Sequence, residues 1–100
     1  MKQKKKIASN EKIPVKLSIN DRDLLLEKTF IDTEHIELLK SAKQRSGMIT
    51  VDLTLDDLDD MLGYIAFEAN HTDDSNLEAA FDEMYDRLSE IESMYELTDD

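Results

Sequence analysis

The stretch MITVDLTLDDLD at residues 48–59 decides most of the fold, because a strand, a helix start and an amphipathic helix follow one another directly there. From Ile49 to Leu53 apolar and polar side chains alternate, and this period of two predicts a half-buried strand. Thr54 comes next, with Asp57 three residues further on. A hydroxyl and a carboxylate at this spacing are typical of a capped helix N-terminus.

The same pattern occurs once before. At an offset of 36 residues, VKLSINDRD at 15–23 aligns with VDLTLDDLD at 51–59. The alternation from Ile13 to Ile19 predicts a first strand, which Pro14 confines to the edge of a sheet, and Ser18 is placed to cap the next helix. Each half of the chain then continues with two helical patterns, so the similarity suggests an internal duplication.

The helices are predicted from apolar periodicity and from capping residues. We expect a first helix over about 19–30 and a second that begins at Asp32 or Thr33, with Gly47 placed to end this helical segment. We expect a third helix from Leu55 to about Asn70 and a fourth from Ser75 to about Tyr95. Ser75 and Glu78 form the S-x-x-E pattern of a capping box. Gly63 lies inside the third helix, where it costs about 1 kcal/mol relative to Ala, and a close approach by a neighbouring element would explain it.

These patterns predict an α+β fold that is mostly helical. Its expected order is β-α-α-β-α-α, with a two-stranded ribbon and a long C-terminal amphipathic helix. With 100 residues, 40% of them hydrophobic, we expect one small domain over residues 13–100.

Composition excludes several classes of protein. The absence of Cys rules out disulfides and cysteine-ligated metal sites, and two glycines are too few for a glycine-rich nucleotide cradle. No catalytic signature is present, so we expect neither an enzyme nor a cofactor. Neither a membrane span nor an export signal is visible, which places the protein in the cytoplasm.

Charge is divided unevenly between the halves. Residues 1–50 carry 11 Lys and Arg against 7 acids, whereas residues 51–100 carry Arg87 against 17 acids. A surface this acidic repels nucleic acid, which leaves only the basic cluster at Lys2, Lys4, Lys5 and Lys6 as a candidate contact. Residues 1–12 lack periodicity and are mostly polar, so we expect a disordered basic tail.

The last predicted helix offers two surfaces. Its apolar positions follow the spacing of a heptad seam, which is used either inside the monomer or between subunits of a homodimer. Its other face is acidic and is suited to a basic protein partner. The candidate interaction residues are Leu77, Phe81, Met84, Leu88, Ile91 and Tyr95 on the seam, and Glu78, Asp82, Glu83, Asp86 and Glu90 on the acidic face.

The two histidines raise an alternative. His35 follows Asp32 by three residues, and His71 follows Glu68 by three, and the two pairs coincide at the offset of 36. A carboxylate and an imidazole at this spacing share a helix face and can ligate one metal ion. A metal-binding or metal-dependent protein is therefore the second hypothesis. The alternative is that each His satisfies main-chain groups at a helix terminus.

The block VDLTLDDLDDMLGYIAFEANHT at residues 51–72 resembles small uncharacterised bacterial proteins. The resemblance implies a bacterial origin and a role for the turn from Glu68 to Thr72, and it implies no activity. The sequence as a whole predicts a non-catalytic interaction or regulatory module, which binds as a homodimer through an acidic helical surface.

Overall fold

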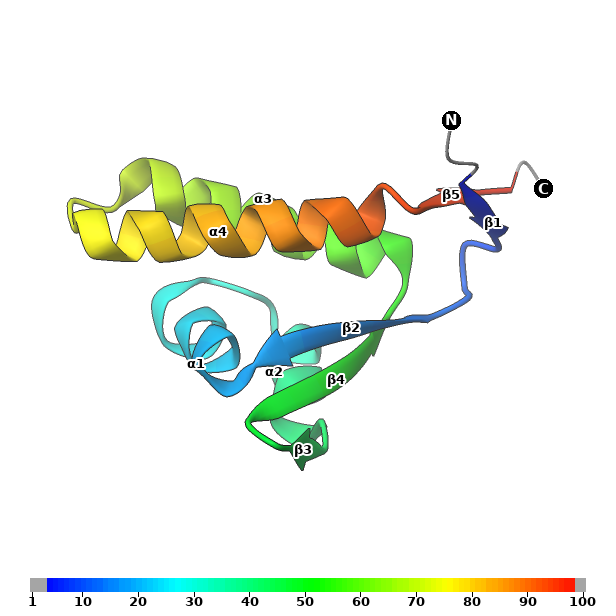
Figure 1. Ribbon diagram of the computed structural model, residues 1–100, viewed down its shortest axis with the longest axis horizontal. Helices are drawn as coiled ribbons and strands as arrows, with labels where there is room; N and C mark the ends of the chain where they lie inside the picture. The colour runs from blue at the N-terminus through cyan, green and yellow to red at the C-terminus, as the bar shows by residue number, and fades with distance from the viewer. Residues whose placement is uncertain (1–3, 99–100) are drawn as a thin grey trace.

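Strands and helical pairs alternate along the chain, as the sequence predicted. The computed structural model describes residues 4–98 (Figure 1). Its fold is α+β and mostly helical, with a three-stranded antiparallel sheet and a small parallel pair of strands. In chain order the elements are β1 (Lys5–Ile7), β2 (Ile13–Ser18), α1 (Ile19–Lys28), α2 (Thr33–Ser41), β3 (Gln44–Arg45), β4 (Met48–Leu53), α3 (Leu55–His71), α4 (Ser75–Glu92) and β5 (Tyr95–Leu97).

The antiparallel ribbon of β2 and β4 is the centre of the fold. Val15 pairs with Val51, Ile13 with Leu53 and Leu17 with Ile49. Val15 and Val51 are 36 residues apart, and a shift of one strand by 36 residues converts the pair Ile13–Leu53 into the pair Ile49–Leu17. This is the register that two copies related by a twofold axis would have. All six side chains are buried, whereas their sequence neighbours on the other face of the ribbon are mostly exposed. The helices therefore cover one face of the sheet only.

Both long strands lead directly into a capped helix. The hydroxyl of Ser18 accepts the backbone N–H of Asp21 at 3.0 Å, and the Asp21 carboxylate accepts the Ser18 N–H at 3.2 Å. Thr54 and Asp57 repeat this reciprocal arrangement at 3.1 and 3.2 Å. Such a capping box satisfies two amides that would otherwise lack partners, which explains why helix follows strand without a loop.

The long helices α3 and α4 lie side by side above the ribbon (Figure 1). Two boundaries of α4 differ from the prediction. Its N-cap is Asp74 rather than Ser75, because the Asp74 carboxylate accepts the backbone N–H groups of Asn76 and Leu77 at 2.9 and 3.2 Å. Its end is Glu92, since the chain turns at Ser93 and continues as β5, so Tyr95 lies in a strand.

The prediction of a disordered tail over residues 1–12 is wrong for Lys5–Ile7. These residues form β1, which pairs in parallel with β5 so that Lys5 lies opposite Tyr95 and Ile7 opposite Leu97. Ile7 is buried in the core, and apolar burial offsets the cost of ordering the segment. Lys2, at the start of the predicted basic cluster, lies outside the described residues.

Candidate functional site

The apolar seam of α4 belongs to the chain's own core. Phe81, Met84 and Leu88 are fully buried, and Leu77, Ile91 and Tyr95 are partly buried against the same core. A second subunit could reach the buried three only if α4 left α3. The seam is therefore used within the monomer, and the interaction surface predicted along it is not available for docking.

The opposite face of α4 is open to solvent and acidic. Arg87 lies among its carboxylates, but its guanidinium donates to the buried Asp21 carboxylate at 2.9 Å. The single Lys or Arg of the second half thus connects α4 to the capping box of α1. All five residues predicted for this face are exposed: Glu78, Asp82, Glu83, Asp86 and Glu90.

A groove beside α3 is the site that the sequence did not predict. It has a volume of about 580 Å³ and lies between α3 and the linker that joins α1 to α2. The aromatic rings of Phe30, Tyr64 and Phe67 line it, together with Gly63. Its remaining lining residues are the acids Asp59, Asp60 and Glu68, and we call the whole site the aromatic-acidic groove.

Gly63 does not have the role that the sequence suggested. A Cβ atom built on Gly63 meets nothing within 4 Å, so no neighbouring element approaches this turn of α3. The expectation of a close approach is wrong. Gly63 instead opens onto the groove, where the missing side chain leaves space over the helix.

Asp59 also connects the groove to the far end of α4. Burial raises the pKa of the Glu92 carboxyl, and the charge and hydrogen bond of Asp59 raise it further, whereas the charge of Lys4 acts in the opposite direction. The acidic surface of α3 is thereby joined to that of α4 through a pair of carboxyl groups.

His35 is buried between two carboxylates. Its Nε2 lies 3.1 Å from Asp57 Oδ1, and since a carboxylate only accepts, the ring N–H donates. Its Nδ1 lies 3.2 Å from Asp32 Oδ1, which already accepts the His35 backbone N–H, and among the described residues Nδ1 has no hydrogen-bond partner. Burial alone would raise the pKa of Asp57, but the hydrogen bonds from His35 and Thr54 bring it below its usual value.

His71 has a different environment. Its Nδ1 lies 2.7 Å from the carbonyl oxygen of Phe67, and its ring stacks on the Phe67 ring with centroids 4.1 Å apart. His35 instead links α2 to α3, and its two nitrogens face different carboxylates.

Across residues 4–98, no group of three or more His, Cys, Asp or Glu side chains is placed to hold a metal ion. The geometry therefore gives no support to the metal alternative based on Asp32, His35, Glu68 and His71.

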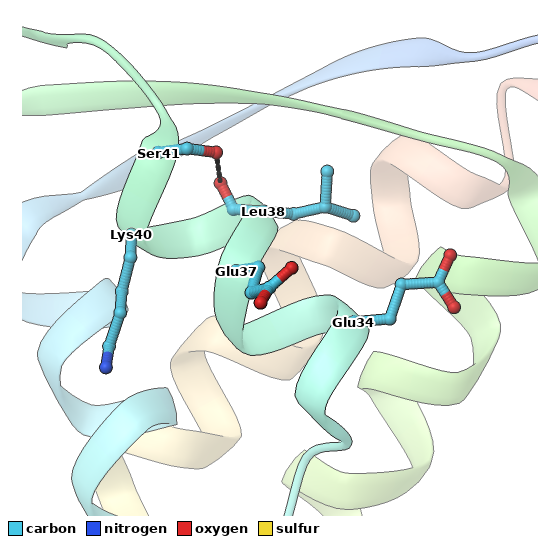
Figure 2. A pocket seen from close by; sticks show the side chains of 5 residues that line it. All are labelled: Glu34, Glu37, Leu38, Lys40 and Ser41. Carbon is cyan, nitrogen blue, oxygen red and sulfur yellow. Dashed lines mark hydrogen bonds between the residues drawn. The ribbon is translucent and has the colours of Figure 1, made fainter.

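A second groove lies along α2 and has mixed charge. Figure 2 shows Glu34 and Glu37 with Leu38 between them and Ser41, while Lys40 extends away from the carboxylates. The Ser41 hydroxyl donates to the Leu38 carbonyl at 3.4 Å. This groove contains no aromatic ring, and both a cation and anions border it. It has less capacity than the aromatic-acidic groove to select a charged ligand.

The sequence contained one signal for the aromatic-acidic groove. Phe67 lies off the apolar stripe of α3, and Gly63 lies one turn before it. An aromatic residue on the polar face of a helix, next to an unexplained glycine, indicates an exposed apolar site. Phe30 could not be added to it, because only the folded chain brings the linker between α1 and α2 beside α3.

Comparison of the chain with protein-family models, curated proteins and solved structures finds no match. Over the part of the chain that is described, no helix is both long and apolar enough to cross a membrane.

Proposed function

We propose that this chain is a non-catalytic interaction module that binds a basic protein partner through the exposed acidic surface of α3 and α4. The observation that supports it most directly is the outer face of α4. Five carboxylates there are open to solvent, and Arg87, the only cation on that helix, is engaged by Asp21. A field of one sign that is not locally neutralised attracts and orients a partner of opposite charge.

The distribution of charge over the molecule agrees with this function. The exposed face of the sheet carries the cations Lys16, Lys43 and Arg45, which border a separate hollow there. These three cations border the sheet and not the two acidic helices, while Lys4 acts on Glu92 at the end of α4. A basic partner meets a one-sided surface, and we expect the charge to accelerate association more than it lowers the dissociation rate.

The experiment is a titration with poly-L-lysine at increasing salt. From about 0.01 M to about 1 M the Debye length falls from about 30 Å to about 3 Å, so binding should weaken steeply. The double variant Glu83→Gln with Asp86→Asn should bind more weakly than wild type. Glu34→Gln with Glu37→Gln removes the same charge from α2 and is the matched control. Equal effects of the two double variants, or a flat salt response, would contradict the proposal.

We also propose that the chain forms a homodimer, but through a surface other than the apolar seam of α4. Since the seam of α4 is in the core, we place the dimer contact at β2, the longer of the two edge strands in the order β2-β4-β3. Open strand edges pair readily with a second chain. The cytoplasmic location likewise stays a prediction.

A further inference from the structure

We propose that the aromatic-acidic groove is the specificity pocket of this interaction module, and that it receives an arginine or lysine side chain of the basic partner. The inference rests on the proposed function and adds a defined site to it. Three features of the groove support it: the exposure of its aromatic rings, the empty space over Gly63, and a lining that contains acids and no base.

Two of the three rings, those of Phe30 and Phe67, are exposed on well-defined segments of the chain. Phe30 is 82% exposed although it lies in a short linker whose surroundings are ordered. Before it, the Thr29 hydroxyl donates to the Leu25 carbonyl at 2.6 Å, and after it Ile31 is buried and Asp32 caps α2. Phe67 is 52% exposed, and the stacked ring of His71 restricts its orientation. Aromatic rings exposed to water are unfavourable for the free chain and favourable for a complex that covers them.

Gly63 points to the same conclusion. A glycine in the middle of a helix costs about 0.5–1 kcal/mol relative to alanine, and here no contact within the chain requires it. The space that it leaves opens into the groove between the rings and the carboxylates. A ligand from outside the chain would make use of that space, whereas a free surface would not need it.

The chemistry of the lining selects a cation. Three rings and three carboxylates surround the groove, and no Lys or Arg is among the described residues that line it. A guanidinium or ammonium group is attracted by the face of an aromatic ring and by nearby carboxylates, and its aliphatic stem packs on apolar surface. A second copy of this chain is not the proposed occupant, since the homodimer proposed above pairs through β2, which contributes no residue to the groove.

The test uses the full chain and a fluorescein-labelled peptide of alternating Arg and Gly, with fluorescence anisotropy as the readout. The same peptide with citrulline in place of Arg keeps the shape and removes the charge, and it should not bind. Phe67→Ala should weaken binding about three- to thirtyfold, the range of a cation–π contact. Gly63→Leu should weaken it about tenfold or more by occupying the groove.

Two controls separate the groove from the rest of the surface. Tyr85→Ala removes an exposed ring of α4 outside the groove and should leave peptide affinity within about twofold of wild type. Gly63→Leu should unfold at a higher urea concentration than wild type, because leucine is the better helix former, so its loss of binding cannot come from misfolding.

The outcomes distinguish this inference from the function on which it rests. If the groove variants bind the peptide like wild type while Glu83→Gln with Asp86→Asn weakens it, the groove is not the pocket and the acidic-surface function stands. Binding of poly-L-lysine without binding of the peptide likewise overturns the pocket and leaves that function in place. If wild type binds neither, both proposals fail. If groove variants turn a dimer into a monomer in native mass spectrometry and leave peptide binding unchanged, the occupant is a second copy and the inference is overturned.

Discussion

Glu92 and Asp59 bring two carboxyl groups together where the end of α4 meets α3. Burial and the charge of Asp59 raise the pKa of Glu92 above its ordinary 4.5. The folded state therefore binds this proton more readily than the unfolded chain does. Ionised Glu92 consequently destabilises the fold above its folded-state pKa, and this destabilisation is lost as pH falls towards 4.5.

Glu92→Gln should therefore increase the free energy of unfolding at neutral pH, and the gain over wild type should shrink as pH approaches 4.5. Urea unfolding monitored by circular dichroism at both pH values measures it. Glu90→Gln, an exposed change on the same helix, should alter stability by less than about 0.5 kcal/mol. A loss of stability in Glu92→Gln at neutral pH would show that the two carboxylates do not repel each other.

The pKa of Asp57 is shifted in the opposite direction. Partial burial acts to raise its pKa, but the hydrogen bonds from His35 and Thr54 outweigh that effect and hold the pKa below the ordinary 3.8. Its contribution to stability is fully present above pH 3.8 and is lost as pH falls through the folded-state pKa.

Asp57→Asn should thus lower the unfolding free energy at neutral pH, and the difference from wild type should decrease below pH 3.8. Acid titration of both proteins, followed by far-ultraviolet circular dichroism, tests this. Asp56→Asn is the neighbouring control, because Asp56 is also in the first turn of α3 but is exposed. Parallel acid profiles for Asp57→Asn and wild type would refute the assigned role of the His35 contact.

At the scale of elements, the start of α4 is decided by one carboxylate. Asp74 accepts two backbone N–H groups, whereas Ser75 is already the first helical residue. Asp74→Ala should cost about 1 kcal/mol, within the range for loss of an N-cap, and Ser75→Ala should cost much less. Urea midpoints of the two variants decide between them. The reverse order would return the cap to Ser75.

The strand β1 makes a second prediction of this kind. Ile7 is 1% exposed, and Ile→Ala changes in a core cost about 2–5 kcal/mol. Ile7→Ala should show a loss in that range, whereas Lys6→Ala on the exposed side of the same strand should stay within about 0.5 kcal/mol of wild type. Chemical denaturation provides the values. Indistinguishable midpoints for the two variants would mean that β1 does not contribute to stability.

Sequence patterns predicted the elements that are defined locally. The strands β2 and β4, their capping boxes and the four helices each follow from the order of side chains within a short window. The strands β1 and β5 have three residues each and exist only because Lys5 meets Tyr95 from the far end of the chain. The groove depends in the same way on Phe30 meeting α3, so neither was visible in a local pattern.

At the scale of the whole molecule, the charges are separated by layer. The α3 and α4 pair carries 11 of the 24 acidic residues of the chain, whereas Lys16, Lys43 and Arg45 border the exposed face of the sheet. The apolar seam of α4 packs within the monomer, so the homodimer that we propose uses the edge strand β2 instead.

We expect native mass spectrometry to detect a dimer whose proportion increases with protein concentration. Because strand pairing relies on main-chain hydrogen bonds, the dimer should persist at high salt, unlike the binding of a basic partner. A mass that stays monomeric at all concentrations would remove the homodimer from the proposal and leave the acidic surface unaffected.

The parallel pair of β1 and β5 also has a kinetic consequence. Its contacts join residues from the two ends of the chain, so forming them early would cost the entropy of closing a very long loop. That cost is smaller once the segments between the two strands have folded. We expect this pair to form last during folding and to open first under native conditions. Such opening exposes Lys5–Ile7 while the helical pairs stay folded. We therefore expect the rate of proteolysis to depend on how often the β1–β5 pair opens more than on the free energy of global unfolding.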